Sequence, residues 1–191
     1  MINTINDITV KQLMDIQKIN PNSINGQKEV MRIIYDIDPD NISVEEFLNN
    51  IVSMPDIFVN GDKSFKRTVT IDGIEFTAKD IKDFSTKEFI DFDTLAQDNN
   101  ENMTTLLALI YSNETFDKMD YIQAITVKRE MMEKLDAGTA LGAIDFFSRA
   151  LLSYIKNIVV SSPAAKTVME KNQKMKSQME VITKYLDSAG N

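Results

Sequence analysis

A β-hairpin is predicted by the stretch Phe65-Lys-Arg-Thr-Val-Thr-Ile-Asp-Gly-Ile-Glu-Phe-Thr77. Apolar and polar residues alternate on both sides of Asp72-Gly73, as in strands with one buried face. Asp-Gly favours a two-residue turn, because glycine adopts positive φ angles at no steric cost. Two strands alone are marginal in water, so we expect the apolar face to pack on helices. The face expected to meet solvent carries Arg67, Thr68, Thr70 and Glu75.

Helical patterns occupy most of the chain on both sides of the hairpin. Candidate N-caps are Thr9, Ser43, Ser85 and Asp120. Ser43 and Ser85 are each followed three residues later by a glutamate, which predicts two capping boxes. The run 104–111 is apolar nearly all round and indicates a buried central helix. Met54-Pro55 is expected to end the helix that Ser43 opens, and residues 98–102 are expected to form a solvated connector.

The order of these elements predicts a mainly α fold. It is a helical bundle with one small β-hairpin inserted after an N-terminal helical cluster, followed by a long C-terminal helix. We expect three parts: an N-terminal helical cluster (1–56), a hairpin plus helical body (57–160), and a C-terminal amphipathic helix or appendage (163–191). Asp136-Ala-Gly138 is expected to end one helix, and Gly138-x-x-x-Gly142 indicates close helix packing.

Composition excludes several kinds of chemistry. The 191 residues include no cysteine and no histidine, so disulfides, Cys/His zinc sites and histidine acid–base catalysis are impossible. The first 100 residues hold 18 acidic and 10 basic side chains, which disfavours direct nucleic-acid contact there. No signal peptide or membrane span is expected, and nothing indicates a cofactor or a small-molecule substrate.

One acidic segment resembles the start of a calcium-binding loop, namely Asp36-x-Asp38-x-Asp40-Asn41. A proline interrupts it, asparagine replaces the turn glycine, and the twelfth position is Phe47, which offers no carboxylate. We therefore expect a polar connector and no metal site.

A second acidic group, Glu88, Asp91 and Asp93, lies on one helical segment. Paired carboxylates perform acid–base chemistry in glycosidases. Here they alternate with large apolar residues, so a solvated helix face is expected and no catalytic residue is assigned.

The segment 163–191 differs from the other helical patterns. Its apolar positions form a narrow stripe, and its five lysines outnumber its three acids. Such a helix gains little by folding alone, so we expect it to dock on its own body or on a partner. Phe146 lies about 100° around the helix from the inward Phe147 and is expected to make a second contact. The candidate partner-binding residues are Phe84, Phe89, Phe92, Phe146, Met175, Met179, Ile182 and Leu186.

The chain after the hairpin resembles a known group of proteins. The resemblance lies in Phe84-Ser-Thr-Lys-Glu-Phe-Ile-Asp-Phe-Asp93, in residues 99–111, in Ile144-Asp-Phe-Phe147 and in the opening residues 8–13. These are similar to small proteins of tailed bacteriophages, notably crAss-like phages, that serve as tail assembly chaperones or as head–tail connector or ring components. The motifs are short and apolar and carry no catalytic residues.

The resemblance implies a non-enzymatic virion structural or assembly protein in the tail or head–tail connector region. Its partners would be other phage structural proteins or copies of itself in an oligomer or ring, in the virion or in the cytoplasm of the infected bacterial host. Two alternatives remain open: a transient tail assembly chaperone absent from the mature virion, and a phage-encoded host-directed binding protein. A small enzyme using Asp91, Asp93 and nearby lysines is the rival from another class, and it requires a pocket that holds these groups.

Overall fold

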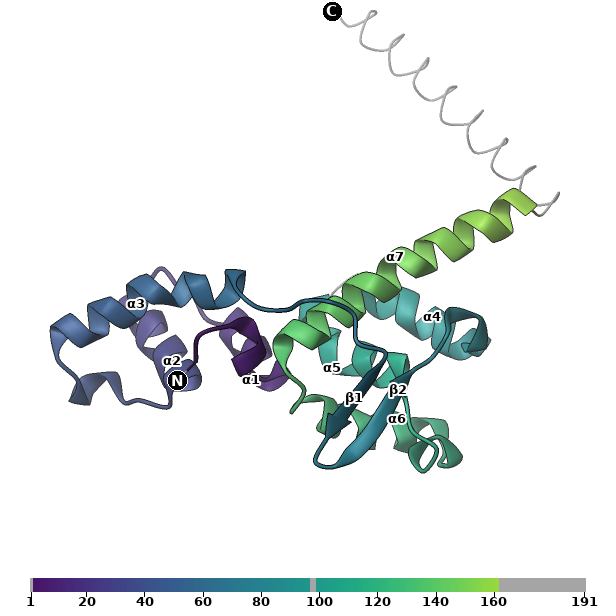
Figure 1. Cartoon of the computed structure of the whole chain (residues 1–191), viewed down its shortest axis with the longest axis horizontal. Coiled ribbons are helices and arrows are strands. Elements are labelled where there is room, and N and C mark those ends of the chain that lie inside the picture. The colour runs from purple at the N-terminus through teal and green to yellow at the C-terminus, as the bar shows by residue number, and fades with distance from the viewer. Residues whose placement is uncertain (1, 97–98, 162–191) are drawn as a thin grey trace, which may run out of the picture. The chain divides into compact units, whose positions relative to one another are not determined.

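The computed structural model describes residues 2–96 and 99–161, and the chain divides into two units, residues 1–148 and 149–191. The helices are α1 (Val10–Gln17), α2 (Ile24–Tyr35), α3 (Val44–Val59), α4 (Thr86–Leu95), α5 (Asn99–Ile110), α6 (Tyr121–Met132) and α7 (Ala137–Ser161). The strands are β1 (Thr68–Ile71), β2 (Ile74–Ala78) and β3 (Tyr111–Ser112). The expected mainly α fold with a small β element after the N-terminal helices is confirmed (Figure 1).

The predicted hairpin forms in the expected register. Val69 pairs with Phe76 and Ile71 with Ile74 across the turn at Asp72-Gly73, where both residues have positive φ angles. Val69, Ile71 and Phe76 are buried, Ile74 is half-buried, and the predicted polar face is exposed, so alternation in the sequence sets the orientation of the sheet. The expectation of only two strands was wrong. β3 pairs antiparallel with β2 and makes a three-stranded sheet in the order β1-β2-β3.

Helix α5 is the centre of the first unit, as the apolar run predicted. It packs against α1, α4 and α6, and every residue from Leu106 to Tyr111 is almost fully buried. The helix ends at Ile110, and the backbone then extends into β3, so the run feeds the sheet as well as the core. The expected solvated connector at 98–102 was also wrong, because α5 begins at Asn99. The side chain of Tyr111 reaches the start of the hairpin, where its hydroxyl donates to the Lys66 carbonyl at 2.7 Å.

The predicted caps are largely confirmed. Thr9, Ser43, Ser85 and Asp120 each accept a hydrogen bond from a backbone N–H in the first turn of their helix. The Ser85 capping box is complete, whereas Ser43 makes only its own half of the box. Met54-Pro55 does not end α3, because Pro55 lies inside the helix, which continues to Val59. Each predicted cap therefore lies at a helix start, whereas the helix end that was predicted from Pro55 was wrong.

The first turns of α7 lie directly on the extended segment that follows α3. A Cβ atom added at Gly138 would lie 2.6 Å from the Asp62 carbonyl oxygen, and one added at Gly142 would lie 2.3 Å from that of Lys63. Because these glycines have no side chain, α7 can contact extended backbone. The expectation that Gly138 ends the preceding helix was wrong. That helix, α6, ends at Met132.

Asn6 joins three segments at this place. Its amide nitrogen donates to the Asp62 carbonyl at 2.8 Å and to the Asp136 carboxylate at 2.6 Å, and its amide oxygen accepts from the Asp62 N–H at 2.7 Å. Asp136 also accepts from the Thr139 N–H and caps α7. The N-terminal residues, the end of α3 and the start of α7 are thus fixed together. Of the helices described, none is long and apolar enough to span a bilayer.

Candidate functional site

The outer face of α3 carries a row of exposed apolar side chains, the α3 stripe. It consists of Val44, Leu48, Val52, Pro55 and Val59. At 100° per residue these positions fall within an arc of roughly 80° along the whole helix. The four apart from Pro55 are between 54% and 77% exposed. A single exposed valine is ordinary, but an aligned row along a helix of 16 residues is typical of a contact surface.

An apolar groove lies beside the stripe, where α3 meets α2 and the loop before it. Its volume is about 430 Å³, and its lining is Pro21, Gln27, Val30, Ile51, Met54, Pro55 and Phe58. Pro55 belongs to both the groove and the stripe. The two features therefore form one continuous apolar surface on α3.

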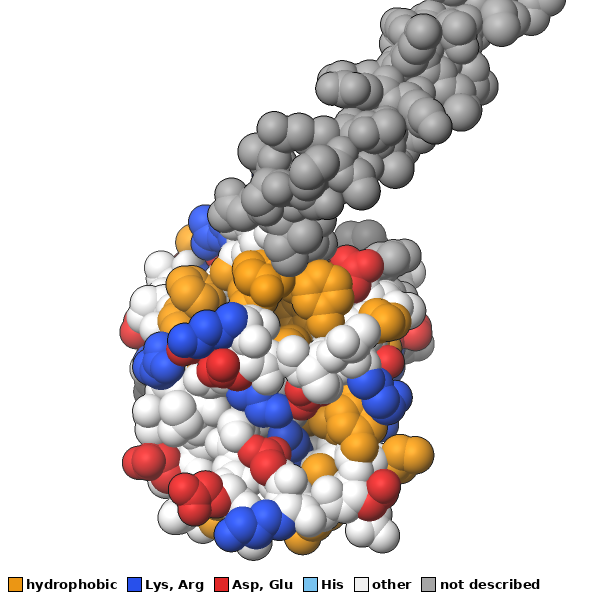
Figure 2. All heavy atoms as spheres, turned by 90° about the vertical axis from the view of Figure 1, so that its right-hand side faces the viewer, with side chains coloured by type: hydrophobic (Ala, Val, Ile, Leu, Met, Phe, Trp, Pro, Cys, Tyr) orange, Lys and Arg blue, Asp and Glu red, His pale blue; other side chains and the backbone are white. Residues whose placement is uncertain are grey.

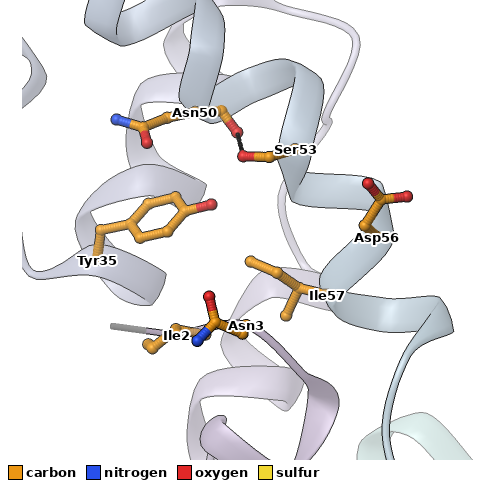
Figure 3. Close-up of a pocket in the computed structure, with 7 residues that line it drawn as sticks. All are labelled: Ile2, Asn3, Tyr35, Asn50, Ser53, Asp56 and Ile57. Atoms are coloured by element: carbon orange, nitrogen blue, oxygen red, sulfur yellow. Dashed lines mark hydrogen bonds between the residues drawn. The ribbon is translucent and has the colours of Figure 1, made fainter.

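A second, smaller pocket lies between α2, α3 and the N-terminal residues (Figure 3). Its volume is about 250 Å³, and its lining is Ile2, Asn3, Tyr35, Asn50, Ser53, Asp56 and Ile57. Figure 3 shows the Tyr35 ring from α2 facing the α3 side chains across this space. The Ser53 hydroxyl donates to the backbone carbonyl of Asn50 at 3.1 Å, so this hydroxyl is engaged within the helix. The pocket is half polar, in contrast to the apolar groove.

The charge on α3 has one sign. Glu45, Glu46 and Asp56 are its only charged side chains, and all three are exposed. The nearest described lysine beyond its C-terminal end, Lys63, donates to the Phe58 carbonyl at 2.8 Å and so satisfies an end of the helix. At 100° per residue, Glu45 and Asp56 border the apolar surface on one side, and Glu46 lies on the opposite face of α3.

Two of the three acids of the calcium-like segment, Asp38 and Asp40, are paired with bases of α2. Arg32 contacts Asp38 and Asp40 at 3.5 and 3.3 Å, and Lys28 also forms an ion pair with Asp40. The hydrogen bond from Lys28 and its positive charge lower the pKa of Asp40 below its usual value. Among the described residues no group of three or more potential metal ligands is found. The segment serves to hold the α2–α3 connection.

The phenylalanines proposed for partner binding form an aromatic cluster inside the first unit. Phe92 is buried, and its ring and that of Phe84 pack around Phe147 at centroid distances of 6.4 and 5.9 Å. Phe146 makes the second contact that the sequence favoured, because its ring stacks on Phe65 at 4.1 Å, yet it remains 44% exposed. Phe89 is half-buried. The structure therefore brings Phe84, Phe92 and Phe146 together.

The other half of the proposed set, Met175, Met179, Ile182 and Leu186, lies outside the described residues. Partner binding by all eight residues stays a prediction. On the face of the first unit seen in Figure 2, hydrophobic side chains form separate groups with charged side chains between them. The α3 stripe is a longer continuous apolar row than any of these groups. Sequence reasoning did not propose it as a binding surface. Its signal was present, since α3 has more apolar residues than one buried face can use.

Buried charges tie the sheet to the helices of the first unit. The Lys128 ammonium lies 3.0 Å from the Asp117 carboxylate, and it donates to the Tyr111 carbonyl at 3.2 Å. Burial lowers the pKa of Lys128, and the charge and hydrogen bond of Asp117 oppose this shift. The hydroxyl of Ser112 donates to the other oxygen of Asp117. Ser112 is thus bonded to a carboxylate that the lysine already holds.

The acids of α4 are engaged in the same way. Glu88 was expected on a solvated face, and this was wrong: it is buried and lies 2.6 Å from the Lys79 ammonium. Asp91 accepts from the Tyr121 hydroxyl at 2.6 Å, and this bond lowers the pKa of Asp91. Asp93 is exposed, as expected. Neither Asp91 nor Asp93 lines the two pockets between α2 and α3, nor the polar pocket of about 530 Å³ beside β2 and β3.

Comparison of the chain with protein-family models, with curated proteins and with solved structures found no significant match.

Proposed function

We propose that this chain is a non-enzymatic structural or assembly protein of a tailed bacteriophage, acting through protein–protein contacts in the tail or head–tail connector region. The observation that carries the binding role is the α3 stripe with its adjoining groove. The phage setting is supported by the resemblance in the order of elements described for the sequence.

The stripe supports a binding role for an energetic reason. Covering a valine or leucine side chain contributes roughly 1.5–3 kcal/mol, so a partner that covers several stripe residues gains several such contributions at once. Aligned residues on one rigid helix also require little reorganisation of the chain on binding. Contacts of this kind suit the assembly of a larger particle.

The state of the charged groups agrees with a non-enzymatic role. Lys128 and Glu88 are each held by a group of opposite charge, and Asp91 is held by a tyrosine hydroxyl. Groups used in this way join elements of the fold. The assignment of the chain as a binding protein therefore rests on its apolar surface, which the fold itself does not use.

Affinity capture from infected cells combined with mass spectrometry of purified virions tests the proposal. The tagged chain is expected to recover tail or connector proteins, and Val52→Asp is expected to lose them because it places a carboxylate within the stripe. Asn49→Asp is the matched control, since it adds the same charge at an exposed position about 100° around α3 from the centre of the stripe.

The outcomes separate the alternatives. Presence in the virion indicates a structural component, whereas capture of tail proteins by a chain missing from the virion indicates a transient assembly chaperone. Recovery of a host protein with no phage protein contradicts the proposal and favours the host-directed alternative. Equal recovery by the Val52→Asp variant removes the stripe as the binding surface.

A further inference from the structure

We infer that the α3 stripe docks the C-terminal segment, residues 163–191, of a second copy of this chain, so that copies join head to tail. The inference rests on the proposed function in taking the stripe as a protein-binding surface, and it names the partner. The occupant is argued from the spacing of apolar residues, from charge and from the direction of α7.

The spacing of apolar residues is the same on both sides. In the stripe, Leu48, Val52, Pro55 and Val59 are separated by steps of four, three and four residues. In the C-terminal segment, Met175, Met179, Ile182 and Leu186 are separated by the same steps. Steps of three and four define the contact seam of two helices that pack side by side in a coiled coil. These four positions cover eleven residue steps on each side, about 17 Å along a helix, and Val44 extends the stripe beyond them.

The charges beside the two rows are complementary. Glu45 and Asp56 lie beside the stripe, Glu46 lies on the opposite face, and α3 contains no base. The C-terminal segment carries five lysines against three acids, with a lysine beside Met175 on each side, at 174 and 176. Pairing two α3 stripes would instead bring acidic flanks together, which is unfavourable. Charge therefore favours the C-terminal segment over a second stripe as the occupant.

The direction of α7 within the first unit favours a second copy over the same chain. The chain leaves α3 after Val59, and Asp62, Lys63 and Phe65 then meet α7 in order at residues 138, 142 and 146. Helix α7 therefore proceeds away from the end of α3 as it runs through this unit. This direction favours docking between copies, with the stripe of one chain and the C-terminal segment of the next as two different surfaces. Such a heterologous contact builds a ring when it closes.

Sedimentation and light scattering on full-length chains test the inference. The wild type is expected to form oligomers, and Val52→Asp and Met179→Asp are each expected to weaken self-association by roughly tenfold or more, because each buries a carboxylate in the seam. Asn49→Asp and Ser177→Asp are the matched controls and should associate as the wild type does, since both lie off the seam.

Mixing the two variants distinguishes docking between copies from docking within one chain. The Val52→Asp chain keeps an intact C-terminal segment, and the Met179→Asp chain keeps an intact stripe. An equimolar mixture is therefore expected to form one-to-one dimers that do not extend further. A mixture that stays monomeric overturns the inference, as does a wild type that is monomeric at all concentrations or unaffected by Val52→Asp.

The self-association experiments can fail while the capture experiment succeeds, and the reverse. A monomeric wild type that still recovers phage proteins through Val52 leaves the proposed function intact and removes only self-docking. Oligomers with the expected variant pattern but no phage partner and no presence in the virion support self-docking and contradict the proposed function.

Discussion

Lys128 is the most deeply buried charged side chain among the described residues, and it shows how one residue links distant parts of the fold. It comes from α6 and meets Asp117, which follows β3, and the backbone of Tyr111 in β3. Removing the lysine would take a donor from the Tyr111 carbonyl and from the Asp117 carboxylate, although Asp117 keeps its hydrogen bonds from the Ser112 hydroxyl and the Asn113 N–H. No local pattern indicated this pair, since a lysine on a helix is normally exposed.

Replacing Lys128 by methionine should destabilise the chain by about 1.5–3 kcal/mol, since the side chain keeps its bulk but loses its hydrogen bonds to Asp117 and to the Tyr111 carbonyl. Urea unfolding at neutral pH measures the change. Lys11→Met is the control, because it breaks the exposed pair with Glu133 and should cost under about 1 kcal/mol. Equal losses in the two variants would show that burial adds nothing to the Lys128 pair.

Glu88 should make stability depend on pH in the acidic range. Burial by itself raises the pKa of Glu88, but hydrogen bonds from Lys79 and from Ser85 lower it by more than burial raises it. The pKa of Glu88 in the folded chain therefore lies below the ordinary value of 4.5. A depressed folded-state pKa gives stabilisation that is present above the unfolded-state pKa and is lost as the pH falls through the folded-state value. The window therefore lies below about pH 4.5.

The difference in unfolding free energy between the wild type and Glu88→Gln is expected to shrink as the pH falls through this window. Urea unfolding at several pH values between 7 and 3 measures it. Glu45→Gln removes an exposed carboxylate and controls for the change in net charge. A difference that stays constant with pH would mean that the charge on Glu88 does not contribute to stability.

At the scale of elements, packing decided the structural effect of one proline and two glycines. Pro55 lies within α3, where it costs the helix a hydrogen bond, yet the helix continues for another turn along the groove. Gly138 and Gly142 lie within α7 and allow its approach to residues 62–64. Proline and glycine are correct indicators of breaks in isolated helices, but here the neighbouring segments decide the outcome.

Gly142→Ala should destabilise the chain by about 2 kcal/mol, because the new methyl group meets backbone that cannot move aside easily. In an open helix position the same change would stabilise, since alanine favours helix more than glycine does. Asn49→Ala on exposed α3 is the control and should be neutral or slightly stabilising. Thermal unfolding by circular dichroism measures both. A stabilised Gly142→Ala variant would contradict the close approach to Lys63.

At the scale of the whole molecule, the first unit contains the sheet, the aromatic cluster and α5 with its neighbours. Its N-terminal residues close the unit through Asn6, which bonds Asp136 across 130 positions of sequence. The first unit therefore has its own core, in which segments distant in sequence are hydrogen-bonded to one another. The α3 stripe lies outside that core.

A chain that ends at Ser161 should have nearly the same free energy of unfolding as the full chain, within about 0.5 kcal/mol, because the core lies in the first unit. The same chain should lose self-association. Urea unfolding and light scattering on the one sample measure both properties. If the shortened chain is unfolded, the C-terminal segment belongs to the core of its own chain and self-docking is wrong.

The sequence by itself determined the hairpin, four helix starts and the central α5. Each of these follows from side chains within a few residues of one another: alternation, a turn pair, a cap, or an unbroken apolar run. The absence of cysteine and histidine likewise restricted the chemistry without any structure.

Only the tertiary structure decided β3, the continuation of α3 through Pro55, the burial of Lys128 and Glu88, and the exposure of the α3 stripe. In each case the deciding partner is distant in sequence or belongs to another element. A two-residue strand has too little local pattern to be recognised, and an apolar helix face is the same in sequence whether it is covered or bare. Packing among the residues that the structure describes leaves this face of α3 uncovered, and the proposed function depends on that result.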